Sequence, residues 1–409
     1  MLTMYQQVIL PLEDYIFMNP VFSDKTKDLA PSAIREIFKS LTDPEMISFA
    51  AGNPSPQSFP IEKMSLISED IFQNDYINAF QYSVTEGYTP LRQLVRQRLA
   101  DKFGINNPDD ELIITTGGQQ GIDLTAKVLC NENDVVITED PSFIGALNAF
   151  RAYNTRLVGV ENEKDGINVE KLEKSIIENP ACKLIYLIPT FQNPSGTTMS
   201  LEKRKRVIEL ANRYDKVILE DNPYGELRFE GEDIPTLKSL DTEDRVIYCS
   251  SFSKVLSAGM RIGFICGNKE IIQKVVVVKQ VNDVHTNIFF QILAARFIER
   301  YGLDDHIAFI RQLYRNKAHL MLDELEKTFD GEIDFTHPQG GLFLWGTMKN
   351  GMDSSEFFRK AISEKVAVVD GKTFMPMPGE CHSFRLNYST PSDEQIVEGV
   401  RRLYRAYHK

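Results

Sequence analysis

One lysine in this chain lies among residue types that bind phosphate. Lys254 follows Ser251 and Ser253, and Arg261 comes seven residues after it. Burial at the end of a strand favours the neutral form of a lysine amine, and a neutral amine attacks an aldehyde to form a Schiff base. An amine beside a phosphate site therefore points to pyridoxal 5'-phosphate (PLP), which carries both an aldehyde and a phosphate. Taken alone, the segment favours a solvated lysine in a surface turn, so other segments must test the idea.

Two further clusters follow strand-like runs and could hold parts of the same cofactor. The first, Thr116–Gly121, opens a predicted helix with two consecutive glycines, and free backbone N–H groups at such a start can hold a phosphate. In the second, Phe143 follows the next strand and could lie flat on a planar ring. A tight strand-to-helix connection and a core aromatic are the alternatives, and each is favoured for its segment alone.

The next two clusters supply an amide and an acid. Asn193, in the run 189–197, can donate a hydrogen bond to a phenolate or carboxylate oxygen. Asp221, at the end of an apolar strand, would keep a nearby pyridine nitrogen protonated, and that charge lets the ring act as an electron sink. Both segments also carry turn signals, so a plain turn and a helix cap are the alternatives.

These clusters fall at the ends of elements that alternate between strand and helix. Strands are expected at 111–116, 134–138, 183–188, 216–219, 245–249 and 261–266, and helices at 118–129, 142–153 and 201–214. Short apolar strands separated by helices predict an α/β fold with a mostly parallel sheet covered on both faces. Ligands bind such sheets at the carboxyl ends of the strands, which is where the clusters lie.

The last third of the chain follows a different pattern. A long amphipathic helix is expected at 304–329, then strands at 332–335, 342–347 and 383–388 with helices at 354–365 and 393–407. This pattern predicts a second, smaller domain of α+β type. We therefore divide the chain into an N-terminal segment (1–50), a large domain (51–300) and a small C-terminal domain (301–409).

Composition argues against several classes of partner. The 409 residues carry 46 Lys and Arg against 58 Asp and Glu, a formal net charge of −12, which disfavours nucleic acid or an anionic membrane surface. No apolar run approaches the ~20 residues of a membrane span. The apolar patch at 8–12 has no basic region before it, so no signal peptide is expected. Five cysteines without CxxC spacing predict reduced thiols in a cytoplasmic protein and no metal site.

Four motifs occur in one order at successive predicted strand ends: Gly-Gly-Gln, Asn-Pro-x-Gly, Asp-x-x-Tyr and Ser-x-Ser-Lys. This series resembles the class I/II aminotransferases of PLP fold type I, and it is most similar to their kynurenine/2-aminoadipate aminotransferase branch. Further similar segments are Ala51–Pro56, Gln81–Ser83 and Phe384–Tyr388, and the resemblance extends from about Pro31 to about Leu403. It implies a large domain with a mostly parallel central sheet and a smaller α+β domain.

The resemblance also assigns roles toward the cofactor. Lys254 would hold PLP and move the proton of the substrate α-carbon, Asp221 would pair with the pyridine nitrogen, and Tyr224 would hydrogen-bond the ring phenolate oxygen. The other implied ligands are Asn193 for the phenolate, Phe143 stacked on the ring, Gly118, Gln119, Ser251, Ser253 and Arg261 around the phosphate, and Tyr82, which would reach the phosphate of the neighbouring subunit. Phe143 departs from the tyrosine of many relatives, and Gly118 stands where serine or alanine is common.

On the substrate side, the resemblance implies that Arg385 clamps the α-carboxylate in a bidentate pair. Gly52 and Asn193 would contact the substrate, and Arg35, within Pro31–Arg35, would meet a distal carboxylate. For the two arginines, an exposed strand position and an exposed helix start are the alternatives.

The implied activity is a ping-pong transfer of an amino group to 2-oxoglutarate by a homodimer. The donor would be an L-amino acid of the aromatic, branched-chain or 2-aminoadipate type. PLP-binding motifs alone leave a β-lyase or a decarboxylase open. A transcriptional regulator of the same fold is the other alternative, although the ~50 residues before Gly52 are too few for a DNA-binding domain with its linker.

Overall fold

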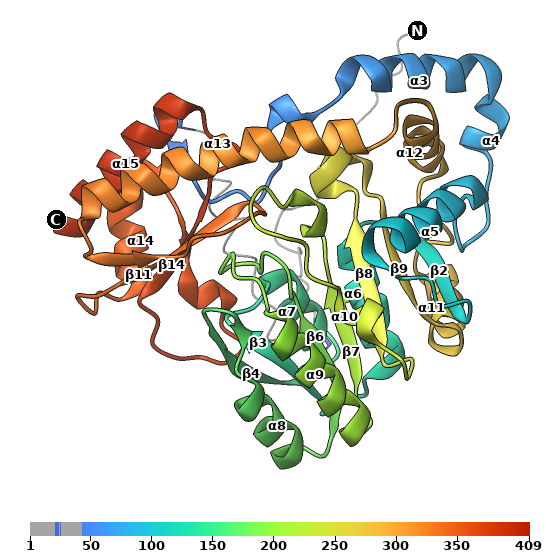
Figure 1. Ribbon diagram of the computed structural model, residues 1–409, viewed down its shortest axis with the longest axis horizontal. Helices are drawn as coiled ribbons and strands as arrows, with labels where there is room; N and C mark the ends of the chain where they lie inside the picture. The colour runs from blue at the N-terminus through green and yellow to red at the C-terminus, as the bar shows by residue number, and fades with distance from the viewer. Residues whose placement is uncertain (1–20, 24, 26–42) are drawn as a thin grey trace, which may run out of the picture.

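The computed structural model describes residues 21–23, 25 and 43–409 (Figure 1). Its centre is an eight-stranded sheet with the order β2-β9-β8-β7-β6-β3-β4-β5. The strands are β2 (Asp110–Thr115), β3 (Val135–Asp140), β4 (Arg156–Glu163), β5 (Gly166–Ile167), β6 (Cys182–Leu187), β7 (Val217–Asp221), β8 (Val246–Ser251) and β9 (Gly263–Asn268). From β4 to β8 all neighbours run parallel, whereas β9 is antiparallel to β8 and β2, and β5 to β4. The predicted mostly parallel sheet is confirmed.

Helices cover both faces of this sheet (Figure 1). One face packs against α6 (Gly118–Leu129), α7 (Ile144–Arg151) and α11 (Lys269–Asn282). The other packs against α8 (Val169–Glu178), α9 (Leu201–Tyr214) and α10 (Leu237–Leu240). Because both faces are covered, the central strands are apolar over nearly their whole length, and polar side chains appear where the strands end.

Strand β7 ends in two adjacent acids that point to opposite faces of the sheet, because successive side chains of a strand alternate. Glu220 accepts hydrogen bonds from the backbone N–H groups of Leu237 (3.0 Å) and Lys238 (2.8 Å) at the start of α10. Asp221 lies on the α6 side, where the Tyr186 hydroxyl donates to it. One acid therefore caps a helix of the fold, and the other belongs to a polar cavity.

A second, antiparallel sheet has the order β10-β11-β14-β13. Its strands are β10 (Ile333–Phe335), β11 (Phe343–Met348), β13 (Val369–Asp370) and β14 (Ser383–Asn387), and its helices are α13 (Asp304–Phe329), α14 (Ser354–Ser363) and α15 (Asp393–His408). A short parallel pair joins β1 (Ile47–Ser48) to β12 (Val366–Ala367), so the chain just before residue 50 pairs with the last third. The division at residues 50 and 300 stays a prediction.

Four helices lie beside the β2 edge of the large sheet: α3 (Ile61–Asn74), α4 (Tyr76–Phe80), α5 (Thr89–Phe103) and α12 (Ile288–Tyr301). In Figure 1, α13 crosses the top of the view from α12 toward α14 and α15. Single helical turns connect the remaining segments: η2 (Pro56–Ser58), η3 (Gly225–Leu227), η4 (Ser253–Ser257), η5 (Ala258–Met260) and η6 (Gly371–Phe374). In the part of the chain that the structure describes, no helix has the length and apolar character needed to cross a membrane.

Three predicted helices have the observed bounds: 118–129, 201–214 and 304–329. The predicted helix 142–153 is shorter, because Phe143 keeps an extended backbone (φ −65°, ψ 118°) and α7 begins after it. Elements that no pattern in the sequence predicted include β4, α3, α5, α8, α11 and α12.

Candidate active site

A cavity of about 380 Å³ lies where the ends of the large-sheet strands face the smaller sheet. The large-sheet part of the chain supplies Gly118, Gln119, Ile122, Phe143, Ile188, Asn193, Asp221, Pro223, Tyr224, Ser251, Ser253, Lys254 and Arg261, and the remaining lining residues are Gly52, Phe343 and Arg385. Every predicted site residue in the described part of the chain except Tyr82 therefore lines one cavity.

Lys254 lies in η4, the helical turn that follows β8. Its Nζ donates a hydrogen bond to the carbonyl oxygen of Gly52 at 2.7 Å. Burial lowers the pKa of Lys254 to about 8, with repulsion from Arg385 and Arg261 acting in the same direction. A large share of this amine is neutral near pH 8, as a nucleophile or a proton acceptor must be.

The start of α6 forms a cationic end of the cavity. Gly117 has a φ of 76°, which side-chain-bearing residues rarely adopt, and a Cβ there would lie 2.4 Å from Nη2 of Arg261. Glycine therefore lets the guanidinium lie against the backbone, where it donates to the Thr116 carbonyl oxygen (3.3 Å). The Ser251 hydroxyl donates to Oγ of Ser253 at 2.7 Å. Backbone N–H groups of a helix start, a guanidinium and two hydroxyls together suit a phosphate group.

Gln119 and Phe143 meet at the edge of this phosphate end. Nε2 of Gln119 donates to the Gly145 carbonyl oxygen at 2.7 Å. A Cβ on Gly145 would lie 2.4 Å from both Oε1 of Gln119 and Cζ of Phe143. The amide of Gln119 therefore holds the segment that carries Phe143, and the group that Gln119 offers to the cavity is its backbone N–H in the first turn of α6.

Asp221 is buried at the end of β7, with 4% of its surface exposed. Burial raises the pKa of Asp221 to about 7, although a hydrogen bond from the Tyr186 hydroxyl (2.7 Å) and attraction to Lys254 act in the opposite direction. An acid buried this deeply is stabilised in its charged form by a cation. A protonated pyridine nitrogen is such a partner.

Asn193 connects the two sides of the cavity. Its Oδ1 accepts a hydrogen bond from Nη1 of Arg385 at 2.8 Å. Because the guanidinium only donates, it fixes which end of the amide faces it. The amide nitrogen then lies toward the Tyr224 hydroxyl, at 3.4 Å. A phenolate oxygen placed beside these two groups would have two hydrogen-bond donors.

Arg385, on β14, is a buried cation with 1% of its surface exposed. Its guanidinium carbon lies 4.2 Å from the ring centre of Phe343 and 5.0 Å from that of Phe374. Nη2 donates to the Ala50 carbonyl oxygen (2.8 Å), and Nε has no hydrogen-bond partner among the described residues. Within residues 43–409, no carboxylate forms an ion pair with it, and burial lowers its pKa to about 10. A cation held between two rings without a counter-ion attracts a carboxylate ligand.

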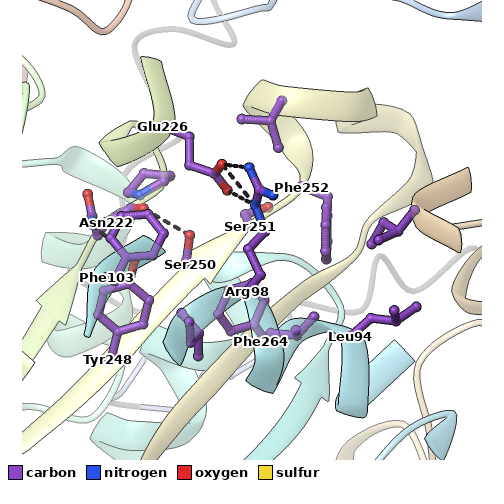
Figure 2. Close-up of a pocket in the computed structure, with 15 residues that line it drawn as sticks. Leu94, Arg98, Phe103, Asn222, Glu226, Tyr248, Ser250, Ser251, Phe252 and Phe264 are labelled. Atoms are coloured by element: carbon purple, nitrogen blue, oxygen red, sulfur yellow. Dashed lines mark hydrogen bonds and ion pairs between the residues drawn. The ribbon is translucent and has the colours of Figure 1, made fainter. Parts of the chain in front are cut away.

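A second, smaller cavity lies near the ends of β7 and β8 (Figure 2). Its volume of about 20 Å³ is room for roughly one water molecule, and it shares Pro223 and Ser251 with the larger cavity. Figure 2 shows Arg98 facing Glu226, whose two carboxylate oxygens each accept from Nε at 3.0 Å. Because Glu226 lies two residues after Tyr224, this ion pair holds the turn η3 against α5. The smaller cavity supports the site and is too small for an amino acid.

One predicted site residue, Tyr82, is described by the structure and does not line the cavity. Tyr82 is 81% exposed, and its ring meets His285 edge-on at a centroid distance of 6.0 Å. Large apolar side chains are also exposed near it in the sequence, on either side of α4 and next to His285, and together with Tyr82 they are here called the α4 surface: Phe72, Tyr76, Ile77, Phe80, Val84, Val281 and Val284. Arg35 lies outside the described residues.

The structure adds residues that the sequence analysis did not name. Phe343 and Phe374 pack on Arg385, Tyr186 binds Asp221, and Ile122 and Ile188 line the cavity. The sequence did indicate Tyr186, because its hydroxyl is an isolated polar group near the end of an apolar strand. Nothing in the sequence indicated Phe374, because it lies in a helical turn outside the sheet strands.

Comparison with known proteins shows similarity over nearly the whole chain. The family described as aminotransferase class I and II matches residues 44–403. Aromatic-amino-acid aminotransferase 1 of Thermococcus litoralis is 38% identical over 386 residues, which are 93% of this chain and 93% of that protein. The 2-aminoadipate transaminase of Thermus thermophilus is 38% identical over 378 residues, 92% of this chain and 93% of that protein. The crystal structure of Pyrococcus horikoshii kynurenine aminotransferase, solved in complex with PMP, has a TM-score of 0.91 at 37% identity and covers 95% of this chain and 96% of its own.

Proposed function

The chain belongs to the class I and II aminotransferases, and on that premise we propose that it moves the amino group of an aromatic, branched-chain or 2-aminoadipate-type L-amino acid to 2-oxoglutarate by a ping-pong mechanism. The fold is PLP fold type I, and the cofactor of the family is PLP. One observation carries the proposal. A half-buried amine (Lys254), a buried acid (Asp221) and a buried guanidinium without an acidic partner in residues 43–409 (Arg385) line the same cavity.

The residues of the cavity fit PLP at its ends. The helix start at Gly118, with Ser251 and Arg261, would hold the phosphate. Asp221 would face the pyridine nitrogen, and Phe143 would lie on the ring. When bound, PLP supplies an electron sink for the negative charge that develops at the substrate α-carbon.

Four further residues would complete the cofactor site. Asn193 and Tyr224, whose side chains lie 3.4 Å apart, would hydrogen-bond the phenolate oxygen. Gln119 would contribute its backbone N–H and Ser253 its hydroxyl at the phosphate end. The shared hydrogen bond between Asn193 and Arg385 would keep the cofactor and substrate sides in a fixed relation.

Lys254 would be the group that moves the α-proton. Its amine, with a pKa of about 8, accepts a proton when neutral and donates it when charged, and a pKa near the working pH suits both steps. The hydrogen bond to the Gly52 carbonyl oxygen holds Nζ within the cavity. Burial keeps bulk water away from the proton while it is transferred.

Arg385 would bind the substrate α-carboxylate. Its position between Phe343 and Phe374 keeps the guanidinium planar face fixed, so a carboxylate meets a preorganised donor pair. A Cβ on Gly52 would lie 3.4 Å from the Phe343 ring and 4.0 Å from Nη2 of Arg385, so glycine keeps this approach open. Substrate held here would present its α-carbon on the Lys254 side.

The donor range is supported by relatives that are named for aromatic amino acids and for 2-aminoadipate. The test is a panel of donors (phenylalanine, leucine, 2-aminoadipate and others) with 2-oxoglutarate, in which glutamate formation is measured. Parallel lines in double-reciprocal plots are expected for a ping-pong reaction. Ammonia or carbon dioxide in place of glutamate would instead indicate a β-lyase or a decarboxylase.

We keep Arg35 as the proposed partner of distal carboxylates. Arg35→Ala should raise KM for 2-oxoglutarate and glutamate more than for leucine or phenylalanine. The expected loss of binding free energy for the acidic substrates is about 1.5–3 kcal/mol, the range for a hydrogen bond to a charged group. An equal rise of KM for acidic and apolar substrates would mean that Arg35 does not bind the distal carboxylate.

We also propose a homodimer formed through the α4 surface, with Tyr82 at the phosphate of the neighbouring subunit. The α4 surface exposes aromatic and branched side chains, among them the stacked rings of Phe72 and Phe80 and the ring of Tyr82 against His285, and exposed apolar side chains of this kind are typical of interfaces. Mixing Lys254→Ala subunits with Tyr82→Ala subunits should restore part of the activity, because one of the two sites in the hybrid keeps both residues. A monomer that stays fully active at high dilution would contradict this.

A cytoplasmic location is proposed on the cysteines. All five are free, and three of them are buried, which fits a reducing compartment. Cell fractionation tests it, and enrichment outside the cytoplasmic fraction would contradict it.

A further inference from the structure

Tyr186 lies directly behind Asp221 in the sheet. Its side chain has no exposed surface, and its hydroxyl donates to Oδ2 of Asp221 at 2.7 Å. Tyr186 on β6 pairs with Leu219 on β7, so the side chains of Tyr186 and Asp221 lie on the same face of the sheet. Within residues 43–409, this hydroxyl is the one hydrogen-bond donor to the carboxylate.

The surroundings of Tyr186 keep it in the donor role. Burial and the nearby charge of Asp221 raise the pKa of Tyr186 well above its ordinary value, so the phenol keeps its proton at neutral pH. The ring packs edge-on against Phe150, with centroids 5.4 Å apart and planes at 68°. A fixed donor to Oδ2 favours the charged carboxylate over the neutral acid and leaves Oδ1 as the oxygen available to the cavity.

We propose that Tyr186 is a positioning residue for PLP, holding Asp221 charged and oriented so that its carboxylate pairs with the pyridine nitrogen. This inference rests on the proposed role of Asp221. Without the hydroxyl, burial alone acts on the acid and favours its neutral form. A neutral, unrestrained Asp221 pairs less strongly with a protonated pyridine nitrogen, so both the affinity for PLP and the electron-sink effect should fall.

The test compares two ligands that differ at one ring atom. Apoenzyme of the wild type and of Tyr186→Phe is dialysed to equilibrium against PLP and against 1-deazapyridoxal phosphate, in which a C–H group replaces the pyridine nitrogen. Tyr186→Phe should weaken PLP binding on the order of tenfold, as expected for one hydrogen bond to a charged group, and should change binding of the deaza ligand by less than about twofold, since a C–H group makes no such bond. In the PLP-loaded enzyme, kcat should fall while KM for the amino donor changes little.

Two control variants separate this role from packing. Tyr248→Phe removes another buried tyrosine hydroxyl, one that accepts from Nδ2 of Asn222 at 3.0 Å and does not contact Asp221, so neither ligand should bind more weakly. Asp221→Ala should weaken PLP binding more than Tyr186→Phe does. Adding Tyr186→Phe to Asp221→Ala should cause no further loss, because the two residues act through one hydrogen bond.

The outcomes distinguish the inference from its premise. If Tyr186→Phe weakens both ligands equally, the tyrosine serves packing and the inference is wrong. It is also wrong if Tyr186→Phe weakens neither ligand while Asp221→Ala weakens PLP. If Asp221→Ala binds PLP as the wild type does, the proposed role of Asp221 itself fails, whatever Tyr186→Phe shows.

Discussion

The two walls of the cavity are built in different ways. The wall from the large sheet presents several groups at strand ends, among them Lys254, Asp221 and the start of α6. The wall from the smaller sheet presents one cation, Arg385, which two aromatic rings and a backbone carbonyl hold in place. The first wall has a donor or acceptor for each end of a cofactor, whereas the second offers a single charge.

This difference separates two kinds of loss. Substitutions on the large-sheet wall should remove cofactor chemistry, and substitutions on the smaller-sheet wall should weaken substrate binding while the cofactor stays bound. No acid pairs with Arg385 in residues 43–409, so under the proposed function a carboxylate ligand would be its counter-ion. The following variants test whether the two walls act independently.

The largest effect is expected on the large-sheet wall. Lys254→Ala should lower transamination by at least about a thousandfold, because the proton-transferring group and the covalent attachment point are both lost. Borohydride reduction of the wild type should fix PLP to Lys254, as peptide mapping would show. A reduced adduct on another lysine would show that Lys254 is not the attachment point of PLP.

On the opposite wall, Arg385→Leu should lower kcat/KM for amino donors by about a hundredfold to a thousandfold, the cost of losing a buried charge-assisted pair. Arg385→Lys should retain part of the activity, since it keeps the charge but not the planar donor pair. The dissociation constant for PLP should change little in both variants. Loss of PLP together with substrate binding would show that the walls do not act separately.

A smaller effect tests the aromatic support of the same cation. Phe374 does not line the cavity, but its ring centre lies 5.0 Å from the guanidinium carbon of Arg385. Phe374→Leu should raise KM for amino donors by about 2- to 30-fold, because a cation–π contact is worth about 0.5–2 kcal/mol. Phe335→Leu is the matched control, because Phe335 packs on Phe384 in the same sheet. Equal changes of KM in both variants would indicate general loosening of the sheet.

The smallest expected effect is a shift in pH dependence. The pKa of Lys254 is lowered to about 8 by burial and by Arg385 and Arg261, so the neutral fraction of the amine grows as pH rises from 7 to 9. The rate at which apoenzyme attaches PLP covalently, followed by absorbance, should rise with a midpoint near pH 8. Arg385→Leu removes one nearby cation and should move the midpoint upward. A midpoint near the ordinary pKa of a lysine would contradict the buried position of this amine.

The sequence predicted the large-sheet wall well, for a physical reason. Parallel strands end at one edge of a sheet, so polar clusters after successive strands are brought together by the topology. The smaller-sheet wall was less predictable. Arg385 was identified only through a resemblance, and Ala50 contributes a backbone oxygen. Phe374 lies in the short helical turn η6, so neither local pattern nor residue type indicated that its ring packs on the guanidinium.

Two kinds of element were also missed by local pattern. β4 has three apolar residues, Leu157, Val158 and Val160, which Gly159 interrupts, and it ends in charged and amide side chains, so its apolar run is too short to stand out. α11 contains four consecutive valines, Val275–Val278, a run that fits a buried strand as well as a helix. In both cases, packing against neighbouring elements decides the structure, and that information is absent from a short window of sequence.

Because Glu220 and Asp221 point to opposite faces of the sheet, β7 should not tolerate the insertion or deletion of a single residue. An insertion or deletion of one residue within β7 would exchange the two faces. The cap of α10 and the acid of the cavity would then be lost in a single event, since each carboxylate would meet the other's surroundings. Changes in length that surface loops tolerate would therefore disrupt both sites when they occur in this strand.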